Sequence, residues 1–151
     1  MKTQAFFFSL LLVLGVTFTA CEKDGDTQII DSSQPVGAFM TDRSGDFIAQ
    51  NGTPTTGMAA VGTDEDGNTF LRFNNEFTTE LGTGTVSVYL STSDEFKPDP
   101  GNGNPDLRLI GAVSQNGENY FRVSSSVASQ FSHVILWCGS ANIPFGYAPL
   151  Q

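Results

Sequence analysis

The chain has 151 residues, of which 16 are acidic and 7 are basic, so its formal net charge is −9 at pH 7. A uniformly acidic surface repels nucleic acid and anionic membranes. The composition therefore argues against either partner for the folded part of the chain.

The first twenty residues have the pattern of a signal peptide. Lys2 supplies a short positive region, and residues 5–16 are apolar apart from Ser9. This apolar run is too short to span a bilayer comfortably. Loss of residues 1–20 would leave six basic and all sixteen acidic residues, a net charge of −10. The remaining 131 residues suffice for one domain with a sizeable core.

The predicted leader ends in the sequence FTAC at residues 18–21, with a small residue directly before a cysteine. This segment resembles the cleavage site of bacterial lipoproteins, although Phe18 replaces the usual Leu, Val or Ile. The resemblance implies that Cys21 becomes the first residue and carries lipid. The protein would then be anchored to the outer membrane, facing the periplasm or the cell surface, with this lipid as its contact with the membrane. The alternative is ordinary secretory cleavage near Ala20, which leaves Cys21 as a thiol.

Residues 21–35 are small, polar and acidic and show no periodicity, which predicts a flexible tether. Acidic residues this close to a lipidated cysteine resemble the surface-export signals of Bacteroidetes lipoproteins. We assign residues 36–151 to a single folded domain.

This domain reads as short strands separated by turn residues, which predicts an antiparallel β-sandwich of about seven or eight strands. Residues 85–90 alternate cleanly between apolar and polar side chains. Three hairpins are expected, around turns at residues 64–67, 115–117 and 139–142. Only residues 124–130 could hold a helical turn. Residues 97–105 contain three prolines and two glycines and should form a projecting loop.

The predicted core is drawn from the apolar positions of these strands. Its members are Val86, Val88, Leu90, Leu109, Val134, Leu136 and Phe145. Most of the phenylalanines after residue 35 should also be buried.

The C-terminal half resembles the DM-thirteen domain, which also occurs beside DOMON domains in animal extracellular proteins. The similar segments are VSVYLS at 86–91, LIGAV at 109–113, NYFRV at 119–123, VILWC at 134–138 and FGYA at 145–148. The likeness extends over roughly residues 36–150. It implies an extracellular β domain with a proposed electron-transfer role, in which Cys138 matches the cysteine suspected of carrying that role. Residues 82–85 (GTGT) depart from the Gly-Pro-Asp-Leu turn usual in the family, so this loop and any binding by it should differ.

The environment of Cys138 decides between two roles. Alternation places Cys138 on one face of its strand with Val134 and Leu136, and His133 on the other face. We therefore expect no metal site at His133 and Cys138. A packed core thiol would be inert, whereas a redox thiol must be reachable.

Two functions remain open at this stage. The first is a redox or electron-transfer domain centred on Cys138, and the second is a structural or adhesive module that binds a protein or glycan through its loops. Catalysis is expected of neither, and no Ser-His-Asp arrangement or phosphate-binding loop is evident. The sequence identifies no cofactor and no particular extracellular or periplasmic partner.

Overall fold

The computed structural model describes residues 33–151, so the predicted signal peptide and Cys21 lie outside the described residues. The described part contains nine strands and one 3₁₀ turn. These are β1 (Met40–Asp46), β2 (Ile48–Ala49), β3 (Met58–Thr63), β4 (Thr69–Phe73), β5 (Val86–Ser91), η1 (Pro100–Asn102), β6 (Leu107–Ala112), β7 (Asn119–Val123), β8 (His133–Cys138) and β9 (Ile143–Pro149).

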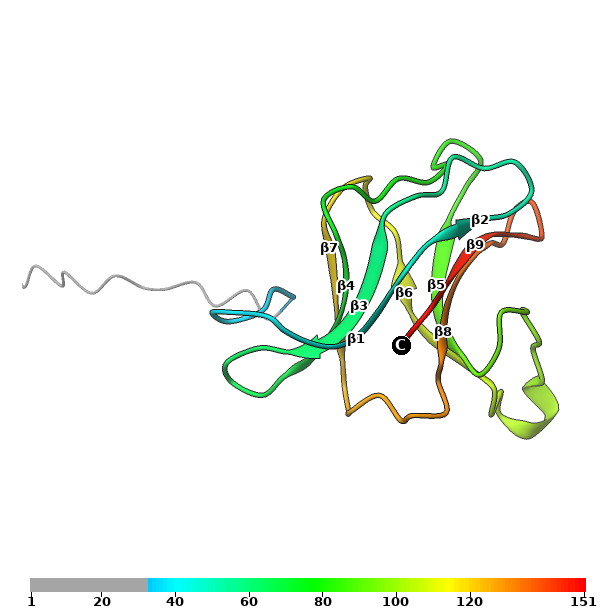
Figure 1. Cartoon of the computed structure of the whole chain (residues 1–151). Coiled ribbons are helices and arrows are strands. Elements are labelled where there is room, and N and C mark those ends of the chain that lie inside the picture. Colours follow the sequence, from blue (N-terminus) through cyan, green and yellow to red (C-terminus); the bar gives the residue numbers. More distant parts are fainter. Residues whose placement is uncertain (1–32) are drawn as a thin grey trace, which may run out of the picture. The chain divides into compact units, whose positions relative to one another are not determined.

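The strands form two antiparallel sheets that face each other (Figure 1). One sheet has the order β1-β3-β4-β7 and the other has the order β2-β9-β8-β5-β6. The predicted all-β sandwich is confirmed, with one or two more strands than expected.

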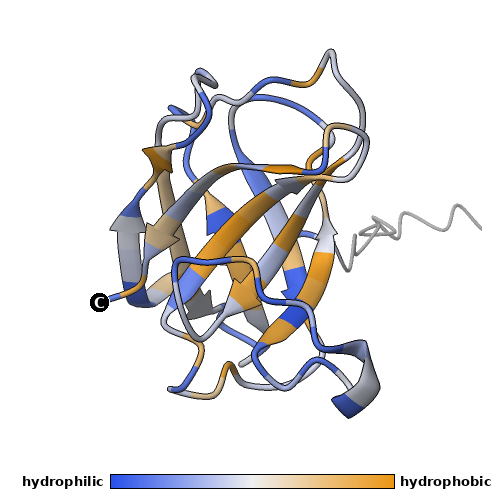
Figure 2. Cartoon of the chain, turned by 90° about the vertical axis from the view of Figure 1, so that its right-hand side faces the viewer, coloured by the Kyte–Doolittle hydropathy of each residue, from blue (hydrophilic) through white to orange (hydrophobic). Residues whose placement is uncertain are grey.

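The core lies between the apolar faces of the two sheets. Hydrophobic and hydrophilic positions alternate along several strands, as the period of two requires (Figure 2). Six of the seven predicted core residues are buried, and most of the phenylalanines after residue 35 are buried as well. The core of the sandwich is therefore built largely as the alternation predicts.

The prediction for Leu109 was wrong, because this side chain is 61% exposed. Val88 pairs with Gly111 and Tyr89 pairs with Leu109, which leaves Ile110 as an extra residue in β6. An extra residue of this kind moves the following side chains to the opposite face of the strand. Leu109 therefore shares the outer face with Tyr89, and Ile110 packs against the core instead.

Two of the three predicted hairpins are confirmed. Strands β3 and β4 pair around residues 64–67, with Gly67 in the left-handed region at φ 77°. Strands β8 and β9 pair around residues 139–142, where Asn142 has φ 56°. Glycine and asparagine adopt this backbone conformation at little cost, which is why they mark such turns.

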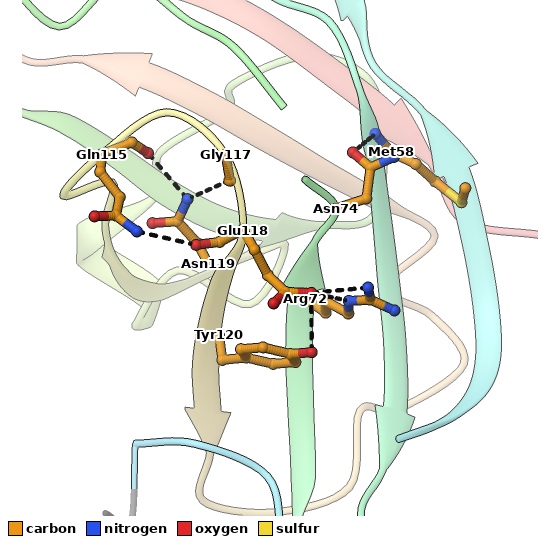
Figure 3. Close-up of polar contacts among 8 residues, drawn as sticks. All are labelled: Met58, Arg72, Asn74, Gln115, Gly117, Glu118, Asn119 and Tyr120. Carbon is orange, nitrogen blue, oxygen red and sulfur yellow. Dashed lines mark hydrogen bonds and ion pairs between the residues drawn. The ribbon is translucent and has the colours of Figure 1, made fainter. Parts of the chain in front are cut away.

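The third hairpin was wrong, because β6 pairs with β5 and β7 pairs with β4, in opposite sheets. Residues 113–118 form a corner that crosses between the sheets. Asn119 holds it by donating from Nδ2 to the carbonyl oxygens of Gln115 and Gly117, at 3.0 and 2.8 Å (Figure 3). Asn116 and Gly117 therefore lie in a turn, as predicted. The strand that follows this turn, however, pairs with a strand of the other sheet.

The sequence did not reveal β1, which is largely polar, or β2, which is only two residues long. The chain runs from one sheet into the other here, and Phe47, between the two strands, is buried. Ser44 and Gln151 exchange two backbone hydrogen bonds of 3.1 Å. These bonds join the first strand to the C-terminal end of the chain, at the edge of the sandwich.

Two segments outside the strands, residues 97–105 and residues 124–130, were predicted as a projecting loop and as a possible helical turn. Residues 97–105 form the expected loop, which projects from the sandwich and contains only the short turn η1 (Figure 1). Residues 124–130 contain no helix. Arg43 holds this segment by donating to the carbonyl oxygens of Phe131 at 2.9 Å and Val127 at 3.5 Å. Within the described part of the chain, no helix is long and apolar enough to cross a membrane.

Asp64 fixes the β3–β4 turn. Its carboxylate is buried and accepts hydrogen bonds from the backbone N–H of Asn68 at 2.7 Å, the side-chain amide of Asn68 at 3.0 Å and the backbone N–H of Val36 at 3.1 Å. Burial raises the pKa of this carboxyl, but the hydrogen bonds from Asn68 and Val36 outweigh it, so its pKa lies below the ordinary value of 3.8. The carboxylate therefore ties the first described residues to the sheet.

Replacing Asp64 with Asn should lower the free energy of unfolding near neutral pH, because an amide cannot accept all of these hydrogen bonds. A depressed carboxyl pKa stabilises the fold above the ordinary value, and this contribution is lost as the pH falls through the folded-state pKa. The difference between the wild type and Asp64→Asn, measured by urea unfolding with Trp137 fluorescence, should therefore shrink below about pH 4. The exposed Asp66→Asn is the control and should change little. A difference that is unchanged at low pH would contradict this account.

Candidate functional site

Cys138 lies at the end of β8, the strand between β5 and β9 in the five-stranded sheet. It pairs with Val86 on one side and Ile143 on the other. The free thiol is fully buried and belongs to the same core cluster as Val134 and Leu136. The predicted face of Cys138 is therefore confirmed.

A loop and a turn lie beside this end of β8. The Thr83 hydroxyl oxygen is 3.7 Å from the Cys138 sulfur, within range of a weak hydrogen bond. Gly84 has φ 132°, and a Cβ atom added there would overlap the Ser140 hydroxyl. The segment of residues 82–85 is exposed and lies against the buried thiol through Thr83. We call this segment the thiol loop.

The opposite face of β8 carries an aromatic cluster. The rings of Trp137 and Phe96 are stacked, with centroids 3.9 Å apart and planes 15° apart, and Tyr89 meets Phe96 edge-on at 5.1 Å. Ile135 lies on this outer face, yet it is fully buried. Trp137 lies outside the core cluster and is half-buried. Phe96 comes from the segment after β5 and covers what would otherwise be an exposed apolar face.

His133 does not share a site with Cys138. It lies at the other end of β8, where its Nδ1 is 2.9 Å from the Ser132 hydroxyl and its ring centroid is 6.0 Å from that of Tyr147. Within residues 33–151, no group of three or more His, Cys, Asp or Glu side chains is arranged to hold a metal ion. His133 and Cys138 therefore lie at opposite ends of β8.

The thiol has no evident means of activation in this state. A nucleophilic cysteine needs a neighbouring cation or a helix N-terminus to stabilise its thiolate. The described residues contain no α-helix, and the polar group in contact with the sulfur is the uncharged Thr83 hydroxyl. The arrangement can shield a thiol and expose it by movement of the thiol loop, but it does not prepare a nucleophile.

Two of the residues around the thiol could have been anticipated. The departure from the usual turn at residues 82–85 indicated that this loop is particular to the chain, and the structure places Thr83 and Gly84 beside Cys138. Nothing in the sequence indicated Phe96, which reaches Trp137 from a different segment.

The described part of the chain is a two-sheet β domain that carries one free, buried thiol at the end of a central strand. Residues 46–150 match the family described as electron transfer DM13, a span that contains β2 to β9 and both sides of the site. The chain belongs to this family. No curated protein and no solved structure shows significant similarity to it.

Native Cys138 should react slowly with a bulky maleimide, about a hundredfold slower than in the urea-unfolded chain, because labelling requires local opening. The full chain with Cys21→Ser keeps Cys138 as its only cysteine. In this background Gly84→Ala should speed native labelling about tenfold, since a side chain is strained at φ 132° and also meets the Ser140 side chain, which loosens the thiol loop.

The matched control is Gly103→Ala, another positive-φ glycine, with no atom within 4 Å of the added Cβ. It should leave the labelling rate unchanged. Fast labelling of the chain without either glycine substitution would contradict the shielding by the thiol loop.

Proposed function

We propose that this protein is a lipid-anchored component of the bacterial cell envelope that acts in electron transfer, with Cys138 as its redox group. Membership of the electron transfer DM13 family supports the general role. The observation that carries the proposal for Cys138 is its position beneath the exposed Thr83, where movement of one short loop would uncover the sulfur.

The chemistry that fits one thiol is exchange with a disulfide of a partner protein. The Cys138 thiolate attacks one sulfur of the partner disulfide, forms a mixed disulfide and releases the other sulfur as a thiolate. A thiolate of a second, dithiol partner then attacks the sulfur of the first partner and releases the Cys138 thiolate. The other thiolate of the second partner resolves the disulfide between the two partners, which leaves the first partner as a dithiol and the second as a disulfide. Cys138 is unchanged overall, and electrons pass from the second partner to the first.

The second candidate is a structural or adhesive module that binds a protein or glycan through its loops. Complete burial of Cys138 among Val134 and Leu136 favours this reading, because a free cysteine packs well as a small apolar side chain. In that case the sulfur contributes to packing and has no redox partner.

Glutathione disulfide separates the two functions. If Cys138 is a redox group, the detergent-solubilised protein should form a reversible glutathione adduct at Cys138 faster than global unfolding allows, as measured by intact mass. If it is a core residue, the adduct should appear only at the rate of global unfolding. Cys138→Ser should then cost about 1–3 kcal/mol, because the buried hydroxyl lacks a full set of partners. Adduct formation limited by unfolding would overturn the redox role.

The anchor is tested separately. Cys21→Ser should release the protein from the membrane fraction, and the mature wild-type chain should be heavier by the mass of the lipid. Detergent-phase partitioning and intact mass measure the two effects. Cys138→Ser, which leaves the leader intact, is the control and should remain membrane-bound. A Cys21→Ser variant that still partitions with detergent would contradict lipidation.

A further inference from the structure

A depression of about 520 Å³ lies where the β3–β4 turn meets the segment after β7. Its walls include Asn68, Thr69, Arg122 and residues 124–126, which are three consecutive serines. Both segments lie at the same end of the four-stranded sheet, where Thr69 pairs with Val123 (Figure 1). We call this depression the Arg–Ser pocket.

Arg122 brings an unneutralised positive charge to the pocket. It is exposed, and its Nη2 donates one hydrogen bond of 2.6 Å to the side-chain oxygen of Asn68. A guanidinium has five N–H donors. Within residues 33–151, the pairs Arg72–Glu118 and Lys97–Glu95 form salt bridges, and Arg122 has no carboxylate in range. Its remaining donors are therefore open to a ligand.

Arg108 adds a second guanidinium behind the serines. It donates to the hydroxyl oxygens of Ser125 and Ser124, at 3.2 and 3.1 Å, and it too forms no salt bridge with the described residues. A hydroxyl oxygen that accepts from a cation keeps its own hydrogen free to donate elsewhere. Arg108 therefore holds both serines with their O–H groups available to an acceptor.

The nearby acidic groups do not cancel this charge directly. Asp64 is turned toward N–H donors of Val36 and Asn68, and the Asn68 amide lies between its carboxylate and Arg122. Glu65 accepts from the backbone N–H of Ala38. Asp66 is exposed on the same turn and weakens the attraction at long range.

The chain gathers positive charge at this pocket. Residues 33–151 contain twelve acidic and five basic side chains, and three of the basic ones, Arg43, Arg108 and Arg122, have no carboxylate partner among these residues. Arg43 is bound to backbone carbonyl oxygens, whereas Arg108 contacts Ser124 and Ser125 and Arg122 lines the pocket with them. Guanidinium and hydroxyl donors together match the oxygens of an anion better than those of a neutral ligand.

We propose that the Arg–Ser pocket binds an oxyanion, with Arg122 in direct contact and Arg108 as the residue that positions Ser124 and Ser125. The ligand carries a sulfate, phosphate or carboxylate group, either as a free anion or on an acidic sugar. This site is independent of Cys138 and of the proposed electron transfer.

The test is a titration of the isotope-labelled, detergent-solubilised full chain, followed by the amide resonances of Asn68 and residues 124–126. Sodium sulfate, sodium phosphate and sodium glucuronate are compared with sodium chloride at equal ionic strength. Saturable shifts with sulfate or phosphate alone assign a tetrahedral anion, and shifts with glucuronate alone assign an acidic sugar. Shifts with all three assign a site that recognises the oxyanion group itself. An effect no greater than that of chloride overturns the proposal.

Two variants and a control test the named residues. Arg122→Gln should weaken binding about tenfold or more, because a charge-assisted hydrogen bond to the ligand is lost. Arg108→Gln should weaken it as well, by releasing the two serines.

The control is Arg72→Gln, since Arg72 is paired with Glu118 at 2.8 Å (Figure 3) and does not line the pocket. It should bind as the wild type does. Equal weakening by Arg72→Gln and Arg122→Gln would reveal a general charge effect and overturn the site. Arg122 is exposed and outside the core, so its variant should fold, which the spread of amide resonances verifies.

Discussion

The structure depends on the alternation of side chains along β8, a strand that is paired on both sides and covered on both faces. Its odd-numbered residues point outward and its even-numbered residues enter the core. A shift of one residue would exchange the two sets and place Trp137 in the core. Val86 meets Cys138 because β5 pairs with β8 in an unbroken register. Ile143 meets Cys138 only after a bulge in which Phe145 is the extra residue of β9.

The same constraint explains why the thiol depends on its surrounding loops. Cys138 is the last residue of its strand, so the sheet pairs with it on both sides but does not cover its end. The thiol loop lies there, and its contact with the sulfur comes from Thr83.

The β8–β9 turn, which follows Cys138, and the segment of residues 124–130, which carries the serines, lie at opposite ends of the sandwich (Figure 1). Cys138 ends β8 beside the start of β5, whereas Arg122 lies near the end of β7 beside the start of β4. Cys138 is buried in an apolar core, whereas Arg122 and residues 124–126 of the other site are exposed. This separation means that a ligand in the Arg–Ser pocket would not touch the thiol, so the two can be studied with independent variants.

Local patterns in the sequence determined the all-β class, the hairpins β3–β4 and β8–β9, and the inward face of Cys138. Each of these depends on alternation or turn chemistry within a few residues. Pairing partners were decided by tertiary structure: the Asn116–Gly117 turn resembles a hairpin turn, but β7 pairs with β4, far away in the chain. The same holds for Leu109, whose exposure depends on a bulge against β5, and for Arg108 and Ser124, which meet across the two sheets. Contacts between distant segments depend on which surfaces are buried together, and a one-dimensional pattern does not contain that information.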